Sequence, residues 1–192
     1  MKKLDTPAKV QGFLNTLPFN LEEKGETLKS PLYSLRTRKI HCFEGALLGA
    51  YILSIHGYKP LLLHLKSTDE DYDHVIVPFK INGFWGALSK TNHAVLRYRE
   101  PIYKSIRELA MSYFHEYFLD NGKKTLRQYS RPLNLNIFEK DWPVSGGDLW
   151  GIDEELDKIK HYDMLPRSMS KKLRKADKIE IEAGKIVEFK RK

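Results

Sequence analysis

The strongest hydrophobic pattern in the chain is the apolar block from Cys42 to Ile55. Its sequence, CFEGALLGAYILSI, is apolar on nearly every side at helical spacing, which is typical of a helix buried in the core. His56 and Gly57 follow it, and a glycine suits the left-handed position after a helix. A second helix is predicted over Thr6–Leu17, where apolar residues recur at helical spacing after a Thr-Pro start.

Strands are predicted downstream of the buried helix. Leu61–Leu65 is a short apolar run, and the alternating runs His74–Ile81 and Phe84–Thr91 flank Asn82-Gly83. Asn-Gly is the commonest two-residue hairpin turn, so we expect these two runs to pair as antiparallel strands.

The register of this hairpin determines what lies beside His74. A two-residue turn predicts three pairs on one face: His74 with Thr91, Ile76 with Ser89, and Pro78 with Ala87. His74 is then the polar member of its face, with the Thr91 hydroxyl opposite and the Ser89 hydroxyl diagonal to it. Asn92 has the wrong parity and reaches His74 only through a bulge or a frayed strand end.

The remaining segments add helices and a second hairpin. Lys29–Ile40 is predicted to be a loop, and Pro101–Leu119 a long amphipathic helix, because its apolar residues recur at a spacing near 3.6. Helices are also expected over Asp148–Ile159 and, briefly, over Ser168–Ala176. Lys178–Phe189 alternates with period two around Ala-Gly and predicts a basic hairpin. The fold class is α+β, with the cysteine-bearing helix packed on a small antiparallel sheet.

Length and charge divide the chain into two parts. Its 192 residues fit one compact domain with an appendage. We assign residues 1–166 to the domain and 167–192 to the appendage, which holds ten Lys and Arg against four acids and so carries +6 of the net charge of +8. A basic nucleic-acid groove across the body is therefore not indicated, whereas the tail is a candidate for contact with a polyanion.

Candidate chemistry is restricted by the single cysteine. One cysteine excludes an intramolecular disulfide and any zinc site with two thiolates, and fits a reducing compartment. No phosphate-binding glycine loop is found, so no cofactor or metal is expected. The N-terminus lacks the apolar core of an export signal, and Ala46–Leu53 is far shorter than the roughly 20 residues of a membrane span. We expect a soluble, cytoplasmic protein without membrane contact.

Cys42 stands where a loop becomes a helix. The unpaired backbone N–H groups and the partial positive charge of a helix start stabilise a thiolate. Thiols in such places fall from a pKa of about 8.5 into a range of roughly 3.5–7.5, which makes them nucleophiles at neutral pH. A lone cysteine is more often a small buried hydrophobe, and a strand-end histidine such as His74 is often only hydrogen-bonded to a hydroxyl.

These residues together resemble the core of the transglutaminase-like cysteine-enzyme superfamily. The resemblance covers about 50 residues: Cys42 with Ala46 at the head of the apolar helix, the run GYKP before a strand, His74 opening the next strand, and the run GFWGALS ending at Ser89. It implies a papain-like fold in which Cys42 is the nucleophile and His74 its base. The family's third residue is an acid that orients the histidine, and here Ser89 stands in that place. Ile76 replaces a frequent aromatic residue.

Three functions are open at this point. The first is a cysteine-dependent hydrolase or acyl transferase that acts on a peptide, another amide or a thioester, with Ser89 or Asn92 orienting His74. The second is an inactive binding module with the same fold, because a hydroxyl loses the charge of the missing acid. The third is a nucleic-acid-binding protein that works through the basic tail.

Overall fold

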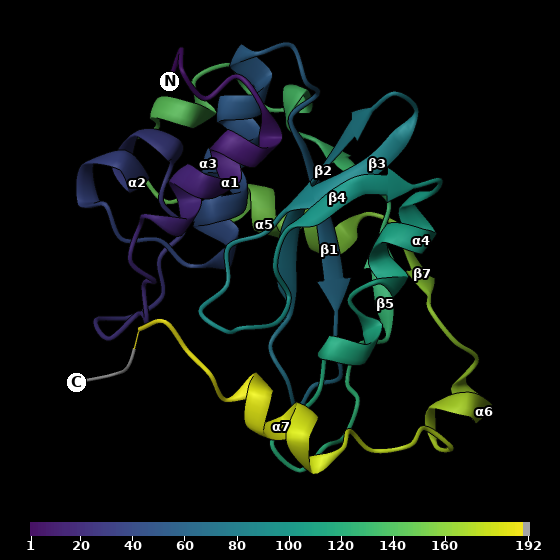
Figure 1. Ribbon diagram of the computed structural model, residues 1–192. Coiled ribbons are helices and arrows are strands. Elements are labelled where there is room, and N and C mark those ends of the chain that lie inside the picture. The colour runs from purple at the N-terminus through teal and green to yellow at the C-terminus, as the bar shows by residue number, and fades with distance from the viewer. Residues whose placement is uncertain (190–192) are drawn as a thin grey trace.

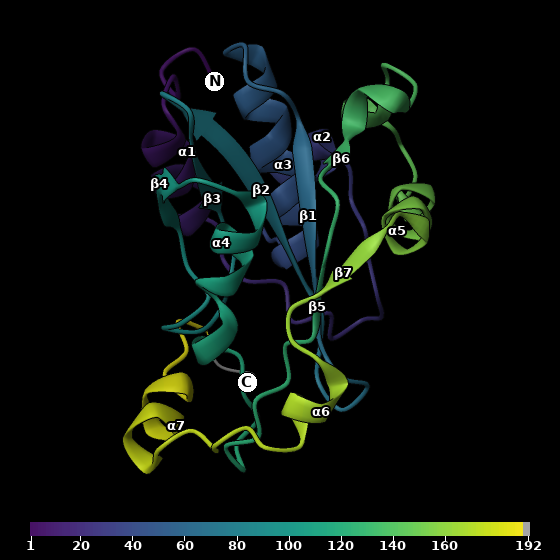
Figure 2. The ribbon, with the colours of Figure 1, turned by 90° about the vertical axis from the view of Figure 1, so that its right-hand side faces the viewer.

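A computed structural model describes residues 1–189 as an antiparallel sheet with helices on both faces (Figure 1, Figure 2). The strand order is β4-β3-β2-β1-β5-β7, and β6 pairs with β1 beside β5. The strands are β1 (Leu61–Lys66), β2 (His74–Ile81), β3 (Phe84–Leu88), β4 (Arg99–Tyr103), β5 (Gln128–Ser130), β6 (Leu133–Asn134) and β7 (His161–Asp163). The predicted α+β class is confirmed.

Two hydrophobic clusters lie on opposite faces of this sheet. Alternate residues of β2 divide between them: Val75 and Val77 face the N-terminal helices, whereas Ile76 faces α4 and the turn after it. Figure 1 shows α1, α2 and α3 on one side of the strands and α4 on the other, and Figure 2 looks onto the α4 side. The helices are α1 (Pro7–Asn15), α2 (Pro31–Thr37), α3 (Cys42–Ile55), α4 (Ile106–Met111), α5 (Trp150–Lys158), α6 (Arg167–Ser170) and α7 (Lys178–Gly184), with 3-10 turns η1 (Phe114–Glu116), η2 (Leu135–Ile137) and η3 (Trp142–Val144).

The central helix α3 has the bounds that its apolar pattern predicts. Ten of its fourteen residues are buried, as expected for a helix that is hydrophobic on all sides. Gly45 lies in its first turn, where an added Cβ would be 2.5 Å from the Cβ of Lys90. The missing side chain therefore lets the segment after β3 approach the start of α3, which is the end that carries Cys42.

The β2–β3 hairpin confirms the predicted turn and part of the predicted register. Asn82 and Gly83 both have positive φ, as a tight hairpin turn requires, and Pro78 pairs with Ala87. β3 ends at Leu88, so the predicted ladder pairs beyond it do not form. Ser89 and the residues after it turn away from the ladder.

The prediction of one long helix over Pro101–Leu119 is wrong. Its first residues form the edge strand β4, where Pro101 is tolerated at an irregularity in the pairing with β3. The Ser105 side chain then accepts a hydrogen bond from the Glu108 N–H and begins α4. The spacing near 3.6 reflects the buried side of α4 and η1 and not one continuous helix.

Two further expectations are corrected. The segment Lys29–Ile40 contains α2, because Pro31 occupies the first turn of a helix capped by Ser30 and does not break it. The hairpin predicted over Lys178–Phe189 is wrong: α7 forms there instead. Asp177 and Glu180 make a capping box at its start, which favours the helix over the period-two alternation. Ser168–Ala176 holds only the end of the short helix α6.

No helix within residues 1–189 has the length and apolar character needed to cross a membrane.

The basic appendage contacts the body through backbone hydrogen bonds. The Ala176 N–H donates to the Gly122 carbonyl, and the Ala94 N–H donates to the Ile186 carbonyl.

Substitution of Gly45 by Ala tests the close approach at the start of α3. We expect Gly45→Ala to lower the free energy of unfolding by about 1–3 kcal/mol, because its Cβ overlaps the buried Lys90 side chain. Gly12→Ala is the matched control: it lies in α1 with open space around it and is expected to gain about 0.5–1 kcal/mol from helix propensity. Urea denaturation measures both, and equal stability of the two variants would contradict the packing described.

Candidate active site

Cys42 is the first residue of α3 and is half-buried. Its own amide, like the next two, has no carbonyl within the helix to bond, and the Phe43 N–H donates to the His41 side chain instead. The sulfur therefore lies at the positive end of the helix dipole. This is the position predicted for a nucleophile.

Two imidazoles stabilise the thiolate of Cys42. Burial by itself raises the pKa of the thiol, but hydrogen bonding and positive charge from His41 and His74 outweigh burial and lower the pKa to about 5. At neutral pH the sulfur is therefore ionised, which is the reactive form of a cysteine.

His41 has a structural role beside the thiol and is not the residue that we expect to transfer protons. It is the N-cap of α3: its Nδ1 accepts from the Phe43 N–H at 3.3 Å, and its Nε2 donates to the Thr27 carbonyl at 2.7 Å. Burial lowers the pKa of His41, whereas Cys42 and Glu44 raise it, and the net direction is upward, to about 9. The contact from the Phe43 N–H belongs to the neutral ring, because a protonated Nδ1 is a donor and cannot accept it. In the charged ring, Cys42 and Glu44 stabilise the added proton.

His74 is held in one tautomer by a chain of hydrogen bonds. Its Nε2 lies 2.8 Å from Ser89 Oγ, and Ser89 Oγ donates its single proton to the Leu96 carbonyl at 2.5 Å. Ser89 must therefore accept the proton of His74 Nε2–H. In the neutral ring this leaves Nδ1 without a proton, so the nitrogen that remains can accept one from a thiol.

Ser89 is itself fixed from both sides. The side chain of Gln11, in α1, accepts from the Ser89 N–H at 2.9 Å and donates to the Ser89 carbonyl at 2.8 Å. Leu96, which receives the Ser89 proton, has a left-handed backbone with φ of 60°. Its N–H donates to Glu116, and Glu116 pairs with Arg99 at 2.7 Å. The one carboxylate in this network thus holds the Leu96 loop and does not touch His74.

The structure decides between the two candidates for orienting His74. Ser89, predicted to be diagonal to His74, contacts its ring, although it lies beyond the end of β3. Asn92 does not: its amide binds the backbone of Phe189, donating to the carbonyl at 2.8 Å and accepting from the N–H at 2.9 Å. Thr91, predicted to face His74 directly, accepts instead from the His93 N–H.

The sequence analysis missed the residues that support the site. Glu44 is fully buried and accepts from the N–H groups of His41 and Lys29 and from the Thr27 hydroxyl. The Lys29 ammonium lies 3.4 Å from the same carboxylate. A glutamate three residues after a helix-capping residue is the capping-box spacing, so the signal for Glu44 was present, with histidine in the place of the usual serine or threonine.

Other polar groups lie away from Cys42. His161 Nε2 is 3.1 Å from His64 Nδ1, and His64 Nε2 is 2.9 Å from Asp73. Asp73 also accepts from the Ser67 N–H, and burial, which raises its pKa, is outweighed by His64 and Ser67. Across the part of the chain described, no three His, Cys, Asp or Glu side chains are grouped to hold a metal ion.

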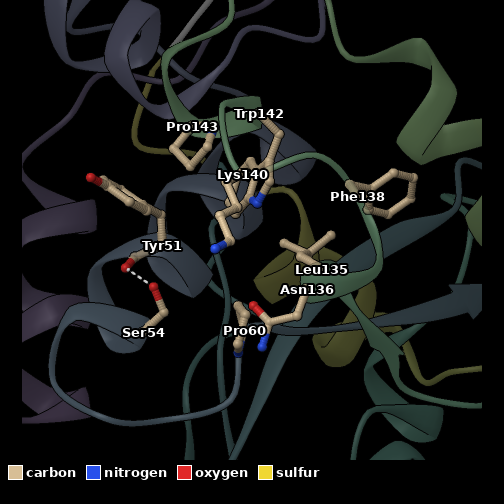
Figure 3. A pocket seen from close by; sticks show the side chains of 9 residues that line it. All are labelled: Tyr51, Ser54, Pro60, Leu135, Asn136, Phe138, Lys140, Trp142 and Pro143. Carbon is tan, nitrogen blue, oxygen red and sulfur yellow. Dashed lines mark hydrogen bonds between the residues drawn. The ribbon is translucent and has the colours of Figure 1, made fainter.

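A surface cavity of about 410 Å³ lies at the opposite end of α3 (Figure 3). Tyr51 and Ser54, from the last turns of α3, line it together with Trp142 and Lys140. Because Cys42 begins the same helix, this cavity is separate from the candidate active site.

Comparison with known proteins gives no relative: no protein-family model matches the chain, and no curated protein matches it.

The alkylation of Cys42 tests the electrostatics of the site. Because the folded-state pKa is lowered to about 5, we expect the rate of reaction with iodoacetamide to rise as pH increases through about 5 and to level off before neutral pH. His74→Ala removes one source of stabilisation and is expected to move the midpoint upward. A native midpoint near the free-thiol value of about 8.5, unaffected by His74→Ala, is incompatible with this environment. Cys42 is the only thiol, so the signal is unambiguous.

Proposed function

We propose that this protein is a cysteine-dependent hydrolase or acyl transferase that acts on an amide or a thioester. The observation that supports it most strongly is the combination of a thiol whose pKa is lowered to about 5 with an imidazole held in one tautomer by Ser89. A cysteine used only for packing needs neither of these. The transglutaminase-like resemblance of the sequence agrees with the assignment.

In the first step, the proton of Cys42 passes to Nδ1 of His74, and the thiolate attacks the substrate carbonyl carbon. A C–S bond forms, and the carbonyl electron pair moves onto the oxygen, which the Cys42 N–H and the positive end of the α3 dipole stabilise. The tetrahedral centre then collapses: the carbonyl reforms, the bond to the amine or thiol leaving group breaks, and His74 supplies the proton that the leaving group needs. The product of this step is an acyl thioester on Cys42.

In the second step, an acceptor replaces the sulfur. Neutral His74 takes a proton from water, or from an amine acceptor, as its oxygen or nitrogen bonds to the acyl carbon. The C–S bond breaks and Cys42 returns to the thiolate, while the acyl group leaves as an acid or as a new amide. Hydrolysis and transfer differ only in which acceptor reaches the site.

Ser89 has a limited part in this mechanism. As a neutral hydroxyl it fixes the ring of His74 but supplies no negative charge to an imidazolium. The alternative of an inactive binding module with the same fold predicts a thiol that alkylates but never turns over. Contact with a polyanion through the basic appendage is compatible with either function and is tested by salt-dependent binding.

Turnover by substituted chains tests the proposal. With p-nitrophenyl acetate as the probe, we expect several molecules of nitrophenol released per chain and a transient acetyl group on Cys42, detected by mass spectrometry. Cys42→Ser abolishes turnover, and His74→Ala slows it by about 10² to 10⁴. Acetylation that stops after one equivalent would support the inactive module instead.

Substitution of Ser89 tests its role in orienting His74. We expect Ser89→Ala to slow turnover about fivefold, the value of one neutral hydrogen bond, while leaving the alkylation midpoint of Cys42 nearly unchanged. Ser34→Ala is the matched control, because its hydroxyl is also buried and has no hydrogen-bond partner among the described residues. If Ser34→Ala and Ser89→Ala slow turnover equally, Ser89 has no special role.

A further inference from the structure

The last described residues of the chain lie against the loop that leaves the candidate active site. The segment Ile186–Phe189, here called the C-terminal strap, pairs antiparallel with Asn92–Ala94: the Ala94 N–H donates to the Ile186 carbonyl, and the Glu188 N–H donates to the Asn92 carbonyl. Figure 1 shows the yellow segment after α7 running toward the N-terminal helices.

Asn92 forms hydrogen bonds with the backbone of the strap and not with its side chains. Its amide donates to the Phe189 carbonyl at 2.8 Å and accepts from the Phe189 N–H at 2.9 Å. An asparagine that satisfies both backbone groups of one residue binds any extended peptide in this position, because every residue except proline offers the same pair. Asn92 is 7% exposed beneath the strap.

Two cations add a preference for certain side chains. Arg97 pairs with Glu188 at 2.8 Å, and the Lys90 ammonium lies 5.8 Å from the centre of the Phe189 ring. An acidic residue followed by an aromatic one thus fits this edge.

The loop that carries this edge also supplies groups to the candidate active site. Asn92 is three residues after Ser89, and Lys90 packs against Gly45 in the first turn of α3. The Leu96 carbonyl, at the far end of the loop, holds the Ser89 hydroxyl. A peptide bound along Asn92–Ala94 therefore lies on the loop that contacts the first turn of α3 through Lys90, at the end of the helix that carries Cys42.

The strap has little fully buried surface. Glu188 is exposed, Ile186 is 61% exposed, and the other two strap residues are half-buried. Segments with few buried apolar contacts open locally at lower free-energy cost than the core.

We propose that Asn92–Ala94 is the edge that binds an extended peptide substrate with an acidic residue followed by an aromatic one, and that the C-terminal strap occupies it in cis until displaced. This names a substrate class for the proposed function and rests on it. A tethered segment competes at an effective concentration of roughly millimolar, so the full chain is autoinhibited toward peptides.

A peptide-binding experiment on the full chain tests the proposal. The probe is a fluorescein-labelled Lys-Ile-Val-Glu-Phe peptide with an amidated C-terminus, and its binding is followed by fluorescence anisotropy. Glu188→Pro removes both the N–H that bonds Asn92 and the carboxylate that pairs with Arg97, which frees the edge. We expect this variant to bind the probe at least about tenfold more tightly than the wild-type chain.

Two controls make the result specific. Adding Asn92→Ala to Glu188→Pro is expected to abolish the gain, and a probe with Lys in place of Glu is expected to bind more weakly because it faces Arg97. If Glu188→Pro disturbs folding, Glu188→Gln, which keeps the backbone donor, gives a smaller gain in the same direction. A Glu188→Pro chain that is folded and binds the probe no better than wild type overturns the proposal.

The measurement separates this proposal from the catalytic one. Probe binding needs no thiol and is repeated in a Cys42→Ala background, where the same gain is expected. Binding by a chain whose Cys42 never turns over would refute catalysis and leave the peptide edge in place. Turnover of p-nitrophenyl acetate without any gain in probe binding would refute the peptide edge alone.

Discussion

The contact between Lys90 and the first turn of α3 is the constraint on which the site depends. Cys42 comes from a helix and His74 from the sheet, so the segment after β3 must run against the start of α3 for Ser89 to reach His74. Gly45 allows this approach because it has no side chain there. The Lys90 ammonium then donates to the carbonyls of Leu14 and Leu17 at the end of α1. Burial lowers the pKa of Lys90 to about 8, and the hydrogen bonds to the two carbonyls offset part of the cost of burying the ammonium.

The parts of the molecule that the sequence predicts well are those decided by local pattern. The bounds of α3 follow from an apolar block that no surface helix carries, and the β2–β3 hairpin follows from Asn82-Gly83. Parity around that turn was enough to bring Ser89 toward His74, although the ladder stops one residue earlier. The candidate site could be predicted because α3 and the β2–β3 hairpin both have clear patterns of apolar and turn residues in the sequence.

The rest depended on contacts between distant residues. Gln11 lies 78 positions before Ser89 in the sequence, and nothing in α1 indicates that its amide will bind that backbone. The apolar spacing over Pro101–Leu119 fitted a helix equally well until the pairing of β4 with β3 decided its first residues. Local periodicity cannot rank these alternatives, because the deciding energy comes from tertiary contacts. The appendage differs: there a local signal, the capping box of Asp177 and Glu180, favours the helix over the period-two alternation.

The absence of an acid beside His74 is less damaging for a thiol than for a hydroxyl nucleophile. A serine must lose its proton during the attack, so the imidazolium formed at that moment needs a carboxylate to stabilise it. Cys42, with its pKa lowered to about 5, is ionised before substrate arrives, so the attack itself transfers no proton to the imidazole. What remains necessary is orientation, and the Ser89 hydroxyl, anchored by the Leu96 carbonyl and by Gln11, provides it. A neutral third residue is therefore consistent with an active Cys-His pair.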